Sequence, residues 1–378
     1  MRITIVQGAF LPVPPVMGGA VEKIWFALGK EFARRGHEVT YISRAVPELP
    51  REEVIEGVRH LRVRGYDAPA SLLRLKGLDL LYSLRARRFL PEAEVLVTHT
   101  FWMPLLVRSP RLGKLYVHVA RYPKGQMRFY GHAARLQTVS NPIREAIVNE
   151  APQLASKVCC IPNPLSGAIP AQLCPSEKPK RLLYLGRVHP EKGIGLLLDA
   201  VGLIPDERFA GWKLFIVGPA ESRYGGGGER YLEELKRRAE KISDRIVWTG
   251  PSFDPAALDE YYRKASLFIY PSLAEKGETF GLAPLEAMAQ GCPALVSNLD
   301  CFRDFLVEDG NGFVFDHRAA NPAAVLSAKL VELMGNPERL AQASIHAHER
   351  ALDFSLERVA TQYLEDFESL QNFRETPL

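Results

Sequence analysis

The sequence predicts an α/β protein built from two doubly wound domains, each with a parallel sheet. Segments typical of strands and helices alternate along the chain, and this alternation restarts after a Pro-, Ser- and Gly-rich stretch at residues 164–180. The length of 378 residues also exceeds a typical single core and fits two domains of ordinary size. Ligands of such sheets bind beyond the carboxyl ends of the strands, so we expect the two domains to face each other across a cleft.

The first domain is expected to cover residues 1–168. Its opening segments are typical of a strand, a Pro- and Gly-rich loop, a helix with apolar residues at helical spacing, and a second strand. Such a unit implies parallel strands, because crossover connections of this kind are almost always right-handed. The helix is predicted at 20–35, and the strands at 2–7, 38–43, 58–63, 95–98, 114–119, 136–139 and 157–161.

The second domain is expected to cover residues 169–354 and repeats the alternation. A run of glycines at 225–228 predicts a flexible surface loop before a charged helix. One amphipathic helix is predicted at 355–370. Strands are predicted at 181–185, 213–217, 245–249, 267–270, 293–296 and 312–315, and helices at 193–204, 229–242 and near 283–291.

Composition indicates a soluble, globular protein of the cytoplasm. Hydrophobic residues make up 47% and charged residues 24%, and the net charge of +4 is too mild to indicate a nucleic-acid partner. The first residues lack the apolar segment and cleavage site of a signal peptide, and no apolar run reaches the length of a membrane span. An odd number of cysteines without zinc-site spacing suggests reduced thiols at Cys159, Cys160, Cys174, Cys292 and Cys301.

The strongest chemical signal is the string from Tyr270 to Gly291, in which a strand leads through a loop into a helix. The start of that helix presents unpaired N–H groups and a positive dipole end, which suit a phosphate, and Gly281 would let a ligand approach the backbone. Glu278 and Glu286 could hold a sugar and a ribose on either side of a diphosphate, because carboxylates accept hydrogen bonds from hydroxyl groups. The plainer alternative is that each is an ordinary acid of the helix or its start.

A second signal follows the first strand of the second domain. Arg187 and Lys192 leave this strand through a loop, after Gly186. A bidentate guanidinium and a point-charge ammonium are natural partners of a diphosphate. The alternative is a basic turn on the surface.

Two weaker signals lie in the first domain. Gly18 and Gly19, between the first strand and the first helix, could place backbone amides against a phosphate, although a lone Gly-Gly pair is weak evidence. His99 follows one predicted strand and His118 lies at the end of another. An isolated histidine in such a position is more often structural than catalytic.

Together these strings resemble the family 4 retaining glycosyltransferases of the GT-B fold, over nearly the whole chain. The family signature is two glutamates separated by seven residues, and Glu278 and Glu286 have this spacing. The flanking Pro271-Ser272, Phe280-Gly281-Leu282 and Gly291-Cys292-Pro293 also match. The first 60 residues, with Gly18-Gly19, are similar to the bacterial spore-coat-SA-like branch of the family.

The resemblance implies a role for each matching residue. Glu278 would touch the donor sugar, Glu286 the ribose, and Arg187 with Lys192 would neutralise the leaving group. His118 would face the reacting sugar, although the Val119-Ala120-Arg121 that follows departs from the family pattern. Arg121 and His99 are candidates for the acceptor site. The remaining donor-binding candidates are Gly18, Gly19, Gly186, Gly218, Ser252, Thr279, Phe280, Gly281 and Leu282.

The resemblance also implies the chemistry. The transferase would retain the anomeric configuration of a hexose taken from a nucleotide-diphosphate donor, most often a UDP-sugar, in the synthesis of a glycan, glycolipid or small glycoside. No Asp-x-Asp motif occurs in the chain, so we expect neither a metal ion nor another cofactor. The C-terminal helix, 355–378, would pack back on the first domain. Two alternatives stay open: a sugar-nucleotide epimerase of the same fold, and a non-catalytic protein that binds sugar nucleotides.

Residues 61–90 carry seven basic and two acidic side chains with leucines between them. A basic amphipathic stretch can lie on an anionic membrane, which would place the protein at the inner face of the membrane. The alternative is a charged helix face or the rim of an acceptor site.

Overall fold

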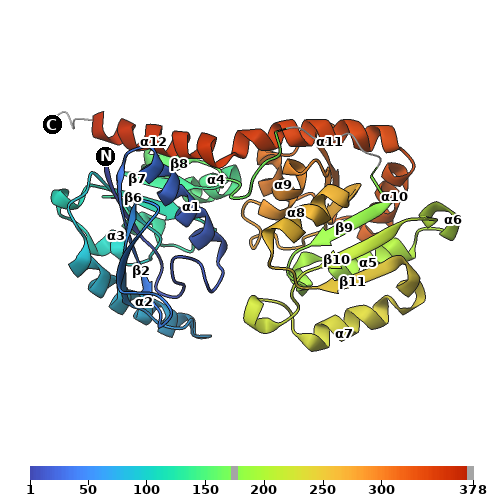
Figure 1. Cartoon of the computed structure of the whole chain (residues 1–378), viewed down its shortest axis with the longest axis horizontal. Helices are drawn as coiled ribbons and strands as arrows, with labels where there is room; N and C mark the ends of the chain where they lie inside the picture. Colours follow the sequence, from blue (N-terminus) through green and yellow to red (C-terminus); the bar gives the residue numbers. More distant parts are fainter. Residues whose placement is uncertain (172–177, 373–378) are drawn as a thin grey trace. The chain divides into compact units, whose positions relative to one another are not determined.

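The computed structural model describes residues 1–171 and 178–372, so Cys174 and part of the predicted domain boundary lie outside the described residues. The chain forms two compact units (Figure 1). Unit 1 comprises Met1–Ser166 and Phe354–Leu378, and unit 2 comprises Gly167–Asp353. Each unit holds one largely parallel sheet with helices, which confirms the predicted α/β class.

Unit 1 is built on an eight-stranded sheet in the order β3-β4-β2-β1-β5-β6-β7-β8. The chain order reverses between β1 and β5, so this is the switch point where the loops after two neighbouring strands diverge. The strands are β1 (Arg2–Val6), β2 (Glu38–Ala45), β3 (Glu52–Ile55), β4 (Val58–Arg64), β5 (Val95–Thr98), β6 (Lys114–Val119), β7 (Arg135–Thr138) and β8 (Val158–Cys160). The helices are α1 (Ala20–Arg34), α2 (Leu72–Ala86), η1 (Arg87–Phe89), α3 (Met103–Leu106), η2 (Pro110–Leu112), η3 (Met127–Phe129), α4 (Asn141–Glu150), η4 (Pro152–Lys157) and α12 (Leu356–Asn372).

One edge of the unit 1 sheet carries an antiparallel pair that the sequence did not predict. The unpredicted strand β3 pairs antiparallel with β4. Only Glu56 and Gly57 join the two strands, and both have positive φ, at 46° and 81°. A two-residue connection of this kind makes a hairpin, whereas parallel neighbours need a long crossover.

The C-terminal helix α12 packs on unit 1 through aromatic side chains (Figure 1). The Tyr363 ring lies 5.1 Å from the ring of Trp25 on α1, and Phe367 meets Tyr116 of β6 edge-on at 4.9 Å. Asp366 pairs with Arg135 of β7 at 2.5 Å. Contacts to both a helix and the sheet make α12 part of the core of unit 1.

Unit 2 contains a six-stranded, all-parallel sheet in the order β11-β10-β9-β12-β13-β14. Figure 1 shows α5 and α7 on one side of it and α8 and α9 on the other. The strands are β9 (Arg181–Leu185), β10 (Lys213–Val217), β11 (Ile246–Gly250), β12 (Leu267–Tyr270), β13 (Ala294–Ser297) and β14 (Gly312–Phe315). The helices are η5 (Pro190–Lys192), α5 (Ile194–Gly202), α6 (Asp206–Phe209), η6 (Ser222–Tyr224), α7 (Glu229–Arg238), η7 (Glu240–Arg245), α8 (Pro255–Lys264), α9 (Leu282–Ala289), η8 (Asp300–Asp304), α10 (Pro322–Met334) and α11 (Pro337–Ala351), followed by η9 (Leu352–Phe354).

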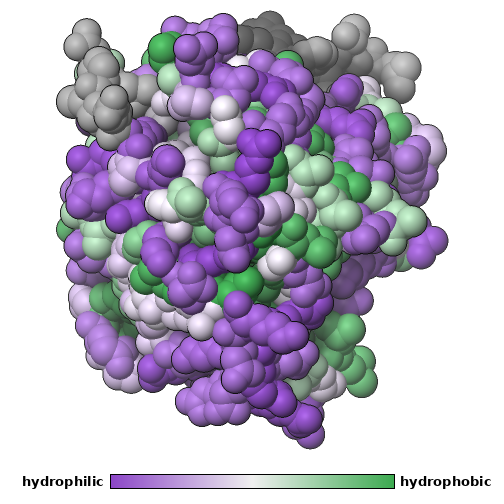
Figure 2. All heavy atoms as spheres, turned by 90° about the vertical axis from the view of Figure 1, so that its right-hand side faces the viewer, coloured by the Kyte–Doolittle hydropathy of each residue, from purple (hydrophilic) through white to green (hydrophobic). Residues whose placement is uncertain are grey.

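One helix boundary in unit 2 differs from the prediction. The helix expected over 229–242 ends at Arg238 and is followed by the 3₁₀ segment η7, inside which Ile242 has φ −126° and ψ 21°, outside the α region. The face of the molecule nearest α6 and α10 carries mostly hydrophilic side chains, with apolar ones in small areas between them (Figure 2). Scattered apolar side chains of this kind are normal for a protein surface.

Candidate functional site

The functional candidates of unit 2 gather at the switch point of its sheet. The chain order reverses between the neighbouring strands β9 and β12. Arg187 and Lys192 follow β9, and Glu278 follows β12. Because parallel strands end at the same edge of a sheet, these side chains lie side by side at that edge. Ligands of such sheets bind there, at the carboxyl ends of the strands.

Glu278 is held by three donors. One of its carboxylate oxygens accepts hydrogen bonds from Lys192 Nζ at 2.7 Å, the Tyr270 hydroxyl at 3.1 Å and the Ser272 hydroxyl at 3.2 Å. The side chains of Lys192 and Glu278 are only 9% and 11% exposed. Two nearly buried opposite charges remain stable only when further hydrogen bonds satisfy them, as the two hydroxyl groups do here. The pKa of Tyr270 is raised well above its ordinary value, mainly by burial and then by the Glu278 charge.

The helix α9 begins directly after the predicted glycine. Gly281 is its N-cap, with φ 94°, and a Cβ at this position would lie 2.5 Å from a ring carbon of Phe302. Only glycine fits this close approach and this left-handed backbone without strain. Glu286 lies on α9, half-buried, and accepts a hydrogen bond from the Tyr262 hydroxyl at 3.2 Å.

Arg187 is half-exposed and already has partners. Its guanidinium donates to the Gly225 carbonyl at 2.6 Å and to the Glu191 carboxylate at 2.8 Å. The Gly227 amide in turn donates to the Val188 carbonyl at 2.8 Å. The glycine run expected to be a flexible surface loop is therefore tied to the loop after β9. The two contacts, to Gly225 and Glu191, hold the planar guanidinium of Arg187 near the switch point, where it can bind an anion.

The other donor-binding candidates of unit 2 lie around these groups. A Cβ at Gly218, after β10, would lie 1.9 Å from the Gly186 carbonyl, so the loops after β9 and β10 pack backbone against backbone. Ser252, Thr279 and Leu282 are half-buried. Phe280 differs, because its side chain is buried against Phe305 at 5.6 Å, so only its backbone could face a ligand.

In unit 1, the glycine pair lies at the start of α1. Gly19 is the N-cap of this helix, and the Glu22 carboxylate lies where a Gly19 Cβ would be, at 2.1 Å. The Gln7 amide donates to Glu22 at 3.0 Å, and the Tyr41 hydroxyl donates to Gln7 at 3.0 Å. A fixed carboxylate beside the glycines opposes an anion there, so the structure gives the Gly18-Gly19 pair no clear phosphate site.

His118 and His99 lie together in unit 1, next to Trp25. The two imidazole rings are 4.8 Å apart, and each packs against the Trp25 indole, at 5.3 Å and 4.8 Å. The Gln137 amide nitrogen donates to the carbonyls of Thr138 and Ile161, both at 2.8 Å. Its oxygen must therefore face His118 Nδ1 at 2.5 Å, so Nδ1 carries the proton and Nε2 is an acceptor.

The two histidines are neutral. Burial lowers the pKa of His118 to about 4, and burial together with His118 lowers the pKa of His99 well below its ordinary value. Both nitrogens of His99 are buried without a hydrogen-bond partner, so its ring is part of the packed core. Arg121, the second acceptor-site candidate, is exposed beyond the end of β6.

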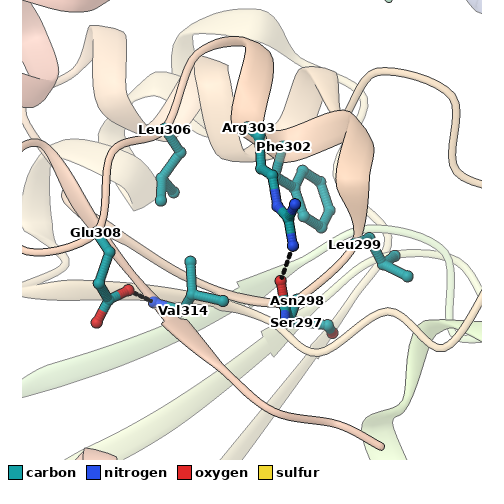
Figure 3. Close-up of a pocket in the computed structure, with 8 residues that line it drawn as sticks. All are labelled: Ser297, Asn298, Leu299, Phe302, Arg303, Leu306, Glu308 and Val314. Atoms are coloured by element: carbon teal, nitrogen blue, oxygen red, sulfur yellow. Dashed lines mark hydrogen bonds between the residues drawn. The ribbon is translucent and has the colours of Figure 1, made fainter. Parts of the chain in front are cut away.

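A cavity of about 390 Å³ lies in unit 2 between the loop after β13 and β14 (Figure 3). Its walls include the apolar side chains of Leu299, Leu306 and Val314, while Arg303 extends toward Asn298 and donates to it at 3.1 Å. None of the predicted site residues lines this cavity. Phe302, whose ring packs against Gly281, is also one of the residues that line the cavity.

Within 1–171 and 178–372, no cluster of His, Cys, Asp and Glu side chains could hold a metal ion. No helix in the same part of the chain has both the length and the apolarity to cross a membrane.

Sequence reasoning missed the residues that hold the site in place. Tyr270, Ser272, Tyr262 and Gln137 contact the predicted carboxylates and imidazole, yet each is an ordinary strand, loop or helix residue in the sequence. Tyr270, the last residue of β12, and Ser272, in the loop that follows, both lie within eight positions of Glu278. That proximity was the available signal, although it does not show which of them face the carboxylate.

Comparisons with known proteins show the family of the chain. The family described as "Glycosyl transferases group 1" matches residues 167–349, and "Glycosyltransferase Family 4" matches residues 17–166. The phosphatidyl-myo-inositol mannosyltransferase of Mycobacterium leprae is 26% identical, over 98% of this chain and 97% of its own. Spore coat protein SA of Bacillus subtilis is 23% identical, over 97% and 99% of the two chains.

Solved structures show the same fold. Sucrose-phosphate synthase from Thermosynechococcus elongatus superposes with a TM-score of 0.77 at 18% identity, covering 98% of this chain and 99% of that chain. Anabaena HepE, solved with UDP and glucose, gives a TM-score of 0.74 at 16% identity, covering 98% and 100%. Both likenesses support the predicted GT-B architecture of two sheets.

The buried imidazoles of unit 1 predict a loss of stability in mild acid. His118 and His60 have folded-state pKa values of about 4, below the ordinary 6.5, because burial disfavours the charged ring. Their contribution is complete above pH 6.5 and is lost as the pH falls toward 4, on the order of 2 kcal/mol for each at pH 5. Thermal unfolding between pH 7.5 and 5 should show this loss in wild type and a smaller loss in His60→Phe. The exposed His346→Gln variant is the control, and melting that is independent of pH would contradict the assignment.

Proposed function

The chain belongs to the family 4 glycosyltransferases, and we propose that it transfers a hexose from a nucleotide-diphosphate sugar with retention of configuration and without a metal ion. The observation that carries the proposal is the arrangement of Glu278, Lys192 and Arg187 at neighbouring strand ends beside the start of α9. Carboxylates suit sugar hydroxyls, whereas cations and helix starts suit a diphosphate.

Each group has a proposed role. Glu278 binds the donor sugar, Glu286 the ribose, and Arg187, Lys192 and the amides at the start of α9 stabilise the charge of the departing diphosphate. The bond between the anomeric carbon and the phosphate oxygen breaks while the acceptor oxygen bonds to the same face. The departing phosphate oxygen takes the acceptor proton. His118, neutral and with Nε2 as an acceptor, is proposed to contact the reacting sugar.

A UDP-sugar is the first candidate donor. HepE, a neighbour in fold, was solved with UDP and glucose, whereas several relatives in sequence are mannosyltransferases. A thermal-shift screen with UDP-, GDP- and ADP-sugars tests the proposal, because a ligand that binds the folded state raises its apparent stability. The absence of a shift with every sugar nucleotide would contradict it.

The epimerase alternative is separated from the transferase by one incubation. The protein with UDP-GlcNAc and no acceptor would yield the 2-epimer if it were an epimerase, whereas a transferase would not form it. Donor binding without turnover across a broad acceptor screen would instead support a non-catalytic binding protein.

Loss of either donor-binding group should slow transfer. Glu286→Ala and Arg187→Ala are each expected to lower kcat/KM at least tenfold, about 1.4 kcal/mol or more, since the first removes a contact to the ribose and the second a contact to the diphosphate. Glu260→Ala, an exposed acid on α8 that pairs with Lys264, is the control. Wild-type rates in both site variants, with the correct donor, would show that the site is elsewhere.

Metal removal should leave transfer intact. The proposed diphosphate partners are side-chain cations and backbone amides, so we expect the rate after treatment with EDTA to equal that of untreated protein. The measurement is initial rate with and without chelator, followed by added Mg²⁺ or Mn²⁺. Loss of activity that a divalent ion restores would overturn the metal-free mechanism.

The acceptor is proposed to be reached at an anionic membrane surface through α2 and η1. Leu72 and Leu73 are 70% and 83% exposed, and Leu81, Leu84 and Phe89 are also exposed. The acidic side chain of the helix, Asp79, is buried, so the exposed charges are the basic Arg74, Lys76, Arg87 and Arg88. Exposed leucines among basic side chains match the apolar and anionic layers of a membrane surface.

Vesicle binding tests this surface. The double variant Arg87→Ala with Arg88→Ala should bind phosphatidylglycerol-containing vesicles about thirtyfold more weakly, as measured by cosedimentation. The reason is that each basic side chain near such a surface contributes about 1 kcal/mol. Arg51→Ala with Arg111→Ala, two exposed arginines of the same unit outside α2, is the matched control. Equal losses in both pairs, or no binding by wild type, would contradict the membrane proposal.

A further inference from the structure

Glu278 lies in a loop, residues 271–281, whose middle is held by a cluster of side chains from elsewhere in unit 2. Three residues before Glu278, the Glu275 carboxylate accepts hydrogen bonds from Arg318 Nε at 2.8 Å and Nη2 at 2.6 Å. His317 Nε2 lies 3.0 Å from the same carboxylate. The Arg318 guanidinium, with His317, holds the pKa of the Glu275 carboxyl below its ordinary value.

The same guanidinium reaches a third loop. Arg318 Nη1 donates to the Asn298 carbonyl, directly after β13, at 2.7 Å. Arg318 itself follows β14, and Glu275 follows β12. One side chain therefore connects the loops at the carboxyl ends of three neighbouring strands. A bidentate guanidinium fixes direction as well as distance, which a lysine in its place would not do.

The ion pair between Glu275 and Arg318 is close to Glu278 along the backbone. The Ala274 carbonyl accepts from the amides of Gly277 at 3.1 Å and Glu278 at 2.9 Å, so residues 274–278 form a single closed turn. Glu275 and Glu278 are both in this turn. A displacement of the Glu275 end would therefore move the Glu278 carboxylate away from Lys192.

Apart from the Glu278 side chain itself, the other attachments of the loop that bear on its position lie near its ends. The Leu273 amide donates to the Glu191 carbonyl at 2.8 Å, and Gly281 is packed on the ring of Phe302. The turn with Glu278 lies between these points. Arg318 and Glu275 are 46% and 51% exposed, and an ion pair this exposed contributes little to global stability. Its contribution is to local geometry.

We propose that Arg318 is a positioning residue for the donor sugar, which acts through Glu275 to place the Glu278 carboxylate. This rests on the proposed function, because it takes Glu278 as the sugar-binding group. It leads to a specific expectation: Arg318 serves the sugar part of the donor and leaves the nucleoside diphosphate part, bound at Arg187 and Glu286, unaffected. A general structural role would weaken both parts alike.

The test compares two ligands on the full chain. Isothermal titration with UDP and with UDP-glucose, or with GDP and GDP-mannose if wild type prefers them, measures the sugar's share of the affinity. Arg318→Met is expected to weaken the sugar nucleotide at least fivefold while the affinity for the nucleoside diphosphate changes less than twofold. Arg318→Lys should recover only part of the loss, because it keeps the charge without the bidentate geometry.

The matched control is Arg238→Met. Arg238 makes a bidentate pair with Asp199 at the same exposure, 46%, but joins α7 to α5 instead of the loops after the strands. It should change neither affinity. Glu275→Gln removes the charge from the other partner and should reproduce the loss, which also covers the case in which Arg318→Met does not fold.

The outcomes separate the inference from the function on which it rests. If wild type binds neither pair of ligands, the donor site is wrong and the inference falls with it. A second outcome is that wild type binds the sugar nucleotide more tightly than the nucleoside diphosphate, and that Arg318→Met and Glu275→Gln keep this preference. In that case only the inference about Arg318 is overturned. Equal loss of both ligands in Arg318→Met would also overturn it, because the effect would then be structural.

Discussion

The nearly buried ion pair between Lys192 and Glu278 is the interaction on which the candidate site depends. It joins the loops after β9 and β12, the two neighbouring strands at which the chain order of unit 2 reverses. Burying two opposite charges costs free energy that their attraction alone does not always recover. The hydroxyl groups of Tyr270 and Ser272 complete the hydrogen bonding of the carboxylate, so the pair can persist before any ligand arrives.

The neighbouring pair of Arg187 and Glu191 is more exposed than this one. Arg187 is 43% exposed and its partner Glu191 36%. A diphosphate could replace Glu191 as the partner of Arg187 at little cost, since an exposed ion pair is worth little in water. The Lys192–Glu278 pair would instead keep its place and present its remaining lone pairs to a sugar. One site therefore combines a fixed group with a group that can change partners.

Unit 1 uses a different kind of chemistry. Its site candidates His118 and His99 are neutral and packed on Trp25, and the His118 ring is aligned by Gln137 instead of by a charge. Neutral imidazoles can be buried without a counter-ion, whereas the carboxylates and cations of unit 2 cannot. The hydrogen bonds of the Gln137 amide to two carbonyls select the tautomer of His118. The two histidine candidates of unit 1 are thus uncharged, whereas Glu278, Lys192 and Arg187 of unit 2 carry charges.

The class of fold, most of the strands and the candidate residues themselves could be predicted from the sequence alone. Periodicity and crossover rules predict the alternating elements, and the spacing of Glu278 and Glu286 carries the family resemblance. Periodicity and spacing involve residues that are close together in the chain, so they can be read from the sequence without knowledge of the fold. The antiparallel edge strand β3 was missed because its signal is only a two-residue turn and four residues.

Only the tertiary structure decided which partners the site residues have. Lys192 lies 86 positions from Glu278, Arg187 lies 38 from Gly225, and Arg318 lies 43 from Glu275. Each of these pairs forms because strands that are distant in the chain end at one edge of the sheet. Side-chain pairing across such distances depends on the order of strands and the packing of loops, neither of which has a period in the sequence.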